Sequence, residues 1–378
     1  MNVRRVLMTA DAVGGVWTYC LHLAAGLAQA GVAIDLAVLG PPPDDAQRTA
    51  AAQIPRLTLW PAAFRLEWME DAARDVVRSG EWLLALAART APDVVHLNGF
   101  AHGALAFPAS KVVMAHSCVL SWWRAVHGCA PPEAWRGYAE AVCRGLAGAD
   151  RVLAPSAAML RALDTHYGPR SAPSSVIANG LPWPRLVPGP KRPLVFAAGR
   201  LWDAGKNIAS LAAVAPTFAW PVIVAGDGAG AQASDGVRHL GRLDAEEMDA
   251  ALRRAAIYAL PARYEPFGLS ILEAAQRGCA LVLGDIESLR ENWTGAAVFV
   301  PPDDVDELGR TIRRLIAEPE TRRALGSTAR RRARRFSAQK MCQATLRLYE
   351  EVVAGLEPVP GRTLTAGTSQ KGAETCAS

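Results

Sequence analysis

The sequence lacks the features that mark a metalloprotein, a secreted protein or a membrane protein. Its seven cysteines include no C-x-x-C pair and no Cys/His cluster at metal-ligand spacing, which argues against a zinc site and against a disulfide framework. We expect the cysteines to be reduced thiols in a cytoplasmic protein. No apolar run is long enough to span a bilayer, and the apolar start before Asp11 is too short for a signal peptide.

Two motifs of cofactor-dependent enzymes are also missing. Glycines follow the first predicted strand at Gly14 and Gly15, but the next is Gly26. The G-x-G-x-x-G fingerprint of a dinucleotide-dependent oxidoreductase is therefore absent. The D-x-D pair that a metal-dependent transferase would need occurs at residues 304–306. Because this pair follows "VPPD", we expect Asp303 or Asp304 to cap a helix. The sequence predicts no metal and no cofactor.

The formal net charge is +5, and arginines concentrate at residues 321–336, "TRRALGSTARRRARRF". One interpretation is a solvated helix face. The alternative is peripheral docking on anionic lipid at the inner face of the membrane. No aromatic-interleaved RNA motif and no helix-turn-helix signature accompanies the arginines, so we predict no nucleic-acid partner.

Both halves of the chain alternate short β-branched runs with helical patterns, which indicates parallel sheets with right-handed crossovers. The proline-rich stretch at residues 180–193 separates them. We predict an α/β protein with two doubly wound Rossmann-like domains, at 1–185 and 186–336, and a ligand cleft between them. A helix at 337–356 is expected to pack back on the N-terminal domain, and 357–378 to form a disordered tail.

The stretch "ARYEPFGLSILEAAQRGC", residues 262–279, places Glu265 and Glu273 around a predicted helix start. Proline is tolerated in the first turn, and Gly268 lets the backbone approach a ligand. The free N–H groups of a helix start suit a phosphate. Each carboxylate could accept hydrogen bonds from hydroxyls of a sugar or a ribose. The alternative is one surface glutamate and one glutamate favoured by the helix dipole.

A second strand–loop–helix elbow, "FAAGRLWDAGKNIASL", carries Gly199, Arg200 and Lys206. A planar guanidinium binds two phosphate oxygens at once, whereas an ammonium supplies a mobile point charge. This pair is suited to a pyrophosphate. The alternative is two exposed cations with no ligand.

Four segments of the C-terminal half, "GRLWDAGKN", "AGDG", "LPARYEPFGLSILEAAQRG" and "VPPDD", together resemble family 4 glycosyltransferases of the two-domain GT-B fold. Glu265 through Glu273 match the E-x7-E motif of that family. The likeness continues in the N-terminal half through "DAVGGVWTY", "PDVVHLNG", "VVMAHS", "ADRVLAPS" and "VIANG". It implies a retaining, metal-independent transferase. Its donor would be a nucleotide sugar, UDP- or GDP-linked, and its acceptor a saccharide, a lipid or lipid-linked sugar, or a small molecule.

The resemblance also implies roles for residues of the C-terminal half. Arg200 and Lys206 would neutralise the leaving diphosphate. Glu273 would hold the ribose hydroxyls, and Glu265 the hydroxyls of the transferred sugar. The loop that begins at Gly199, and the backbone amides of Phe267, Gly268 and Leu269, would touch the phosphate or the sugar.

In the N-terminal half, the resemblance has Gly14 and Gly15 close over the phosphate. His116 matches a histidine that contacts donor sugar or acceptor in similar enzymes. Residues 287–290 depart from the family pattern, because Glu287, Ser288 and Arg290 stand near the expected donor position where relatives carry small residues.

Alternatives remain at this point. A non-catalytic sugar-nucleotide binding protein and a nucleotide-sugar epimerase share the fold. The pair Trp122 and Trp123 is open to three interpretations: lining an acceptor site, dipping into a membrane surface, or packing between domains.

Overall fold

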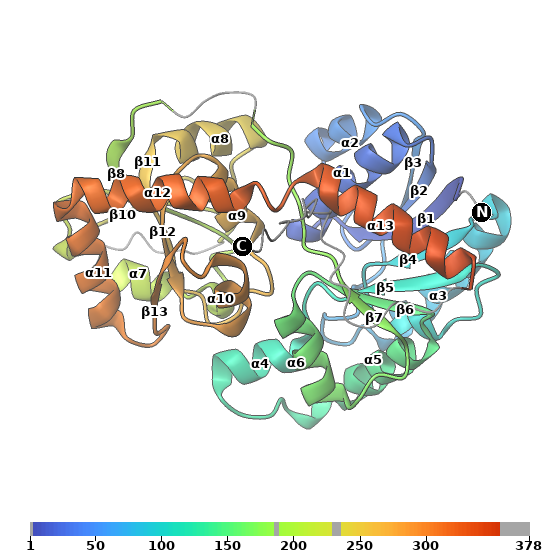
Figure 1. The fold of residues 1–378 in the computed structure, drawn as a ribbon. Coiled ribbons are helices and arrows are strands. Elements are labelled where there is room, and N and C mark those ends of the chain that lie inside the picture. Colours follow the sequence, from blue (N-terminus) through green and yellow to red (C-terminus); the bar gives the residue numbers. More distant parts are fainter. Residues whose placement is uncertain (1–2, 185–188, 229–235, 356–378) are drawn as a thin grey trace, which may run out of the picture.

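The computed structural model describes residues 3–184, 189–228 and 236–355, which form two α/β lobes side by side (Figure 1). Part of the proline-rich linker, the predicted boundary at 185/186 and the predicted tail at 357–378 lie outside the described residues. The two lobes confirm the predicted fold class. No helix in the described ranges is long and apolar enough to cross a bilayer.

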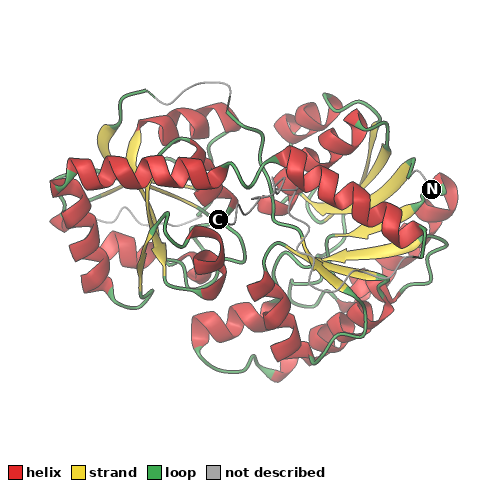
Figure 2. Cartoon of the chain, in the orientation of Figure 1, coloured by secondary structure: helices red, strands yellow, loops and turns green. Residues whose placement is uncertain are grey.

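The N-terminal lobe contains a parallel sheet in the order β3-β2-β1-β4-β5-β6-β7. Its strands are β1 Arg5–Asp11, β2 Ala33–Leu39, β3 Leu57–Ala62, β4 Val94–Leu97, β5 Ser110–Met114, β6 Arg151–Ala154 and β7 Ser174–Val176. Its helices are α1 Gly15–Gln29, α2 Asp45–Ala52, α3 Ala73–Thr90, α4 Val119–His127, α5 Arg136–Gly148 and α6 Ala157–Tyr167. Helices cover both faces of the sheet (Figure 2), so central strands such as β4 are apolar on both sides.

The C-terminal lobe contains a second parallel sheet in the order β10-β9-β8-β11-β12-β13. Its strands are β8 Arg192–Ala198, β9 Val222–Ala225, β10 Val237–His239, β11 Ala255–Leu260, β12 Ala280–Gly284 and β13 Val298–Val300. Its helices are α7 Ile208–Val214, α8 Ala245–Arg254, α9 Leu269–Gln276, α10 Glu287–Trp293, α11 Val305–Ala317 and α12 Pro319–Ala333. As the sequence predicted, Asp304 caps α11 by accepting a hydrogen bond from the Glu307 amide at 2.8 Å.

Strand β3 contains Pro61, a residue that argues against a strand when the sequence alone is considered. A proline cannot donate to a sheet ladder and is therefore confined to edge strands. β3 is an edge strand and pairs only with β2 in this sheet. The short strands β7 and β13, which also stand at edges, carry too few residues to show a pattern.

The last helix, α13 Ala338–Val353, crosses from the C-terminal lobe and lies along α1 of the N-terminal lobe (Figure 1). The approach is close, since a Cβ added at Gly26 would lie 2.7 Å from the Cys342 side chain. Tyr349 of α13 also forms a 2.6 Å hydrogen bond with Nδ1 of buried His96. His96 is thus a buried core residue with a hydrogen-bonding partner.

The arginines of α12 are largely engaged within the lobe. Arg322, Arg330 and Arg332 donate to backbone carbonyls at the C-terminal ends of α11, α9 and α10. The acceptors are Leu315 and Ile316 for Arg322, Gln276 for Arg330, and Asn292 and Thr294 for Arg332. These contacts stabilise helix ends whose carbonyls lack intrahelical partners. Membrane docking by the exposed arginines of α12 stays a prediction.

Candidate active site

The loop after β8 carries the two predicted cations. Asp203 begins the 3₁₀ turn Ala204–Lys206, because one of its oxygens accepts a 2.9 Å hydrogen bond from the Gly205 amide. The other oxygen pairs with Arg200 at 2.8 Å. This Asp-x-Gly turn brings Arg200 and Lys206 to the same edge of the C-terminal sheet, and it fixes the guanidinium through a charge-assisted bond.

Lys206 reaches the second predicted loop. Its Nζ lies 2.6 Å from Oε2 of Glu265, and the two side chains are only 15% and 12% exposed. A largely buried ion pair needs further hydrogen-bonding partners to offset the cost of desolvation. The phosphate or hydroxyl groups of a ligand in the neighbouring cleft can supply such partners.

Helix α9 starts directly beside this pair. Gly268, at its N-cap, has φ = +87°, and a Cβ there would lie 2.5 Å from Ile271 Cδ1, so this turn requires glycine. Among the described residues, no side chain caps the helix start. The first-turn amides, beginning at Leu269, therefore remain available to an anion, at the end of the helix that carries about half a positive charge.

Glu273 is the fifth residue of α9. Burial raises the pKa of Glu273 to about 7, while Arg277 lowers it and Asp249 raises it further. The carboxyl group is therefore partly protonated near neutral pH. In either form it can accept a hydrogen bond from a hydroxyl group.

The turn between β1 and α1 lies against these loops from the opposite lobe. Gly14 has φ = +123°, and a Cβ at this position would lie 3.8 Å from Nη1 of Arg200. A Cβ at Gly15 would lie 3.7 Å from Leu269 Cδ1. The absence of side chains at Gly14 and Gly15 leaves space directly over Arg200 and the start of α9.

His116 follows β5 on the N-terminal side. Asn98 Nδ2 donates to the Thr9 carbonyl at 2.6 Å, which leaves Asn98 Oδ1 to accept from His116 Nε2 at 2.8 Å. Burial, and secondarily the neighbouring His96, lower the pKa of His116 to about 3. The imidazole is thus neutral at physiological pH, with the proton on Nε2 and Nδ1 left as an acceptor.

All these residues line one cleft of about 1040 Å³ between the lobes. Its lining includes every site residue predicted from the sequence: Gly14, Gly15, His116, Gly199, Arg200, Lys206, Glu265, Phe267, Gly268, Leu269 and Glu273. The structure thus brings together side chains that are far apart in sequence. Their individual roles toward a ligand stay predictions.

Two protein-family models match the two lobes. Residues 13–182 match the model described as Glycosyltransferase Family 4, and residues 190–332 match the model described as Glycosyl transferases group 1. The chain is a family 4 glycosyltransferase.

Curated relatives agree with this assignment. Glycogen synthase of Mycobacterium tuberculosis (strain ATCC 25618 / H37Rv) is 28% identical over 381 residues, spanning 89% of this chain and 91% of the relative. The MMP alpha-(1->4)-mannosyltransferase of Mycolicibacterium hassiacum is 37% identical over 125 residues, but this covers 32% of this chain and 30% of that protein. The relatives thus share the enzyme class but are named for different substrates.

Solved structures share the GT-B fold. Sucrose-phosphate synthase from Thermosynechococcus elongatus superimposes with a TM-score of 0.77 at 20% identity, covering 93% of this chain and all of that one. Anabaena HepE in complex with UDP-glucose gives a TM-score of 0.72 at 18% identity, with 93% and 100% coverage.

Several cleft residues of the glycosyltransferase were missed by sequence reasoning. Asp11 lines the cleft at the end of β1. Burial raises the pKa of Asp11, and the hydrogen bond from the Val13 amide and the charge of Arg200 offset only part of that rise. Asn98, Asp203 and Tyr264 also line the cleft. The Asp-x-Gly spacing in "WDAGKN" could have identified Asp203 as a turn residue. Asp11 ends β1, whereas Asn98 and Tyr264 stand in loops, and none of the three belongs to a distinctive pattern.

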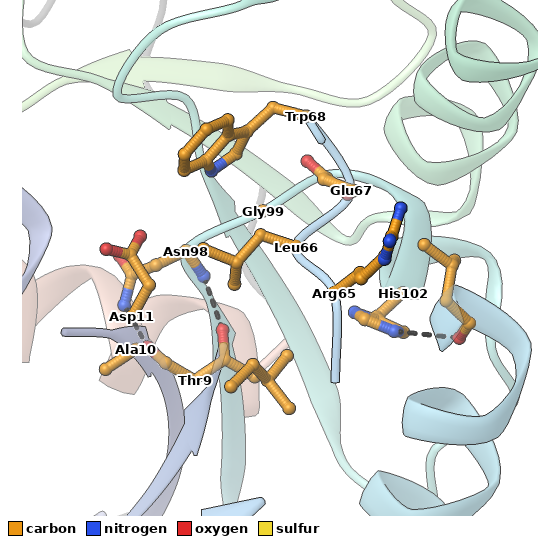
Figure 3. A pocket seen from close by; sticks show the side chains of 12 residues that line it. Thr9, Ala10, Asp11, Arg65, Leu66, Glu67, Trp68, Asn98, Gly99 and His102 are labelled. Carbon is orange, nitrogen blue, oxygen red and sulfur yellow. Dashed lines mark hydrogen bonds between the residues drawn. The ribbon is translucent and has the colours of Figure 1, made fainter. Parts of the chain in front are cut away.

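A small recess of about 50 Å³ adjoins the cleft in the N-terminal lobe of the glycosyltransferase. Figure 3 shows Asp11, Glu67 and Trp68 around it, with Arg65 on the far side from Asp11. The Glu67 carboxylate is held by the backbone amides of Phe100 and Ala101, each at 2.8 Å. The lining of the recess therefore combines an aromatic ring, two carboxyl groups and a cation.

Residues 287–290, which depart from the family pattern, lie behind Glu265. Among the described residues, they are not part of the cleft lining. Ser288 donates a 2.7 Å hydrogen bond to the Glu265 carbonyl, and Glu287 pairs with Arg161 of α6 at 2.6 Å. Their position relative to a bound donor stays a prediction. Their contacts support the glutamate loop and the interface between the lobes.

Proposed function

We propose that the protein transfers a sugar from a nucleoside-diphosphate sugar, UDP- or GDP-linked, to a saccharide or lipid-linked acceptor. The transfer retains the anomeric configuration and needs no metal ion. One observation carries the proposal: Arg200, Lys206 and the uncapped start of α9 share one wall of the cleft. The structural neighbour HepE, whose fold this chain shares, was solved with UDP-glucose.

The three positive groups can stabilise the negative charge that develops during the reaction. The diphosphate gains negative charge as its bond to the sugar breaks, so fixed cations and amide dipoles stabilise the transition state more than the ground state. Arg200 is held by Asp203 and Lys206 by Glu265. Preorganised donors of this kind are each worth about 2.7–4 kcal/mol in similar settings. Because Arg200, Lys206 and the start of α9 supply positive charge directly, we propose that the transfer needs no metal ion.

The two glutamates stand on either side of that anion site. Glu265, at the cleft edge of the ion pair, is placed to accept hydrogen bonds from hydroxyls of the transferred sugar. Glu273, about one turn inside α9, is placed to accept them from the ribose. His116 stays neutral because burial lowers its pKa to about 3, so it binds the donor sugar or acceptor as a hydrogen-bonding group.

Retention follows from the face on which the acceptor attacks in the step that we propose. The bond between the anomeric carbon and the phosphate oxygen breaks while the acceptor oxygen bonds on the same face. The acceptor's proton passes to the leaving phosphate oxygen. No protein base is then needed. The Glu265 carboxylate, bound to Lys206 at 2.6 Å, serves binding rather than nucleophilic attack.

The acceptor enters from the N-terminal wall in this proposal. Glu67 and Trp68 of the recess offer a carboxylate for hydroxyl groups and a ring for the apolar face of a pyranose (Figure 3). This combination favours a saccharide over a purely apolar acceptor.

A donor panel tests the proposal. UDP-, GDP- and ADP-linked hexoses are incubated with the protein in EDTA, with and without oligosaccharide acceptors, and products are analysed by NMR. We expect one nucleoside diphosphate to be released and the anomeric configuration of the donor to be retained. Inversion would contradict the retaining mechanism. An epimerised nucleotide sugar without transfer would favour the epimerase alternative, and no binding of any donor would contradict the donor site.

A further inference from the structure

Helix α4 belongs to the N-terminal lobe, but its first two turns contact the loops of the C-terminal lobe that carry the predicted catalytic charges. Trp122 Nε1 donates to Asp203 Oδ1 at 2.9 Å. Ser121 Oγ bonds the Tyr264 hydroxyl at 2.8 Å, and that hydroxyl accepts from the Cys118 amide at 3.1 Å. One short helix therefore contacts both charged loops of the opposite lobe.

These two loops are themselves joined. The Gly205 carbonyl accepts from the amides of Arg263 and Tyr264 at 2.9 and 3.1 Å. A Cβ at Gly205 would lie 2.9 Å from Trp122 Nε1, so the indole packs directly on this junction. A change in the position of α4 is thus transmitted to Arg200 and Lys206 on one loop and to Glu265 on the other.

Asp203 is the central contact. Its side chain is 5% exposed, and both oxygens are engaged. One oxygen pairs with Arg200, and the other accepts from the Gly205 amide and from Trp122. Rotation of this carboxylate breaks all three bonds together. The indole from the other lobe therefore fixes the group that in turn orients the Arg200 guanidinium.

We propose that Trp122 is a positioning residue, which holds Asp203, and through it Arg200, in the orientation that a donor diphosphate requires. The inference rests on the proposed function. Trp122 acts through Asp203 and so differs from the residues that touch the diphosphate. Because coupling is reciprocal, diphosphate binding in turn stabilises the docking of α4 on the C-terminal loops. Trp122 therefore packs between the lobes, and in this proposal that packing orients Arg200.

The test compares two tryptophan variants. Trp122→Phe removes the indole N–H and keeps an aromatic ring. Trp60→Phe is the matched control, because Trp60 Nε1 also donates to an aspartate, Asp35, at 2.9 Å, but within the N-terminal sheet and away from the cleft. Each variant and the wild type are titrated calorimetrically with UDP, GDP and ADP and with the corresponding nucleosides.

For the diphosphate that binds the wild type, we expect Trp122→Phe to raise Kd about tenfold. This is the size of effect expected when a hydrogen bond to a charged group is lost. Nucleoside affinity stays unchanged in Trp122→Phe, and Trp60→Phe behaves as wild type with every ligand. A purely structural role would weaken nucleoside and diphosphate equally, and that result overturns the inference, as does unchanged diphosphate affinity.

Tyr264→Phe removes the second contact of α4 and keeps the ring. If Trp122→Phe does not fold, this variant must show the same selective loss of diphosphate affinity; wild-type affinity in it overturns the inference. If the wild type itself binds none of the three diphosphates, the proposed function fails, and the inference with it. If the wild type and the variants bind the diphosphate equally well, that result overturns only the positioning role.

Discussion

The two walls of the cleft are built on different physical principles. On the C-terminal wall, charges are paired at short range, as in Lys206–Glu265 and Arg200–Asp203, and two of these side chains are less than 15% exposed. The N-terminal wall presents glycines, a neutral histidine and tryptophans, and its carboxyl groups, Asp11 and Glu67, accept hydrogen bonds from backbone amides rather than pairing with a cation at short range within the described part of the chain. The first wall is suited to one charged group in one place, and the second to neutral ligands of varied shape. In the function proposed above, the first wall binds the donor diphosphate and the second binds the acceptor.

The largest effect is expected from the charged wall. Lys206→Ala should reduce turnover by about 10²–10³-fold and weaken nucleoside-diphosphate binding, since it removes a preorganised cation. Calorimetry and donor turnover measure both. Lys191→Ala is the control, because Lys191 donates to the Leu252 carbonyl at 3.0 Å in the same lobe but outside the cleft. Equal losses in both variants would show a general defect of the lobe.

A pH effect is expected from Glu273. Its pKa is raised to about 7, mainly by burial, so the folded protein binds more protons than the unfolded chain between about pH 4.5 and 7. Stability therefore falls as pH rises through that window. Glu273→Gln should remove this slope. Thermal denaturation between pH 5 and 8 measures it, and parallel curves for wild type and variant would contradict the raised pKa.

A smaller and more selective effect is expected from the N-terminal wall. Trp68→Ala should raise the acceptor KM by about two- to tenfold, because stacking on an aromatic ring contributes about 0.5–1.5 kcal/mol. Nucleoside-diphosphate affinity should not change. The measurement uses the acceptor found in the donor panel. Loss of nucleotide affinity in Trp68→Ala would contradict the proposal that the two walls bind different ligands.

The smallest effect on ligand binding is expected behind the charged wall, in α12. Arg332→Gln should lower the free energy of unfolding by about 1.5 kcal/mol, since Arg332 donates to two carbonyls at the end of α10. Arg323→Gln is the control, because its exposed pair with Glu320 contributes little. Urea denaturation of both variants checks the contrast, and nucleotide binding should be unchanged in each.

Much of the C-terminal wall could be predicted from sequence because its residues are close along the chain. Arg200 and Lys206 stand on one elbow, and Glu265, Gly268 and Glu273 on another; local turn chemistry and helical spacing suffice to place them. Strand β3 shows the opposite case. Its proline argues against a strand, and only its position at the sheet edge permits it.

The sequence by itself determined the two α/β units and the two strand–loop–helix elbows, because each depends on short-range patterns of burial, turns and charge, and its motifs carried the resemblance to the family. Only the tertiary structure decided which carboxylate each cation meets, that Tyr349 of the last helix hydrogen-bonds His96, and that Trp122 reaches Asp203 across the cleft. Those contacts join residues far apart in the chain. Their partners are chosen by how the two lobes and α13 pack, and packing leaves no local pattern in the sequence.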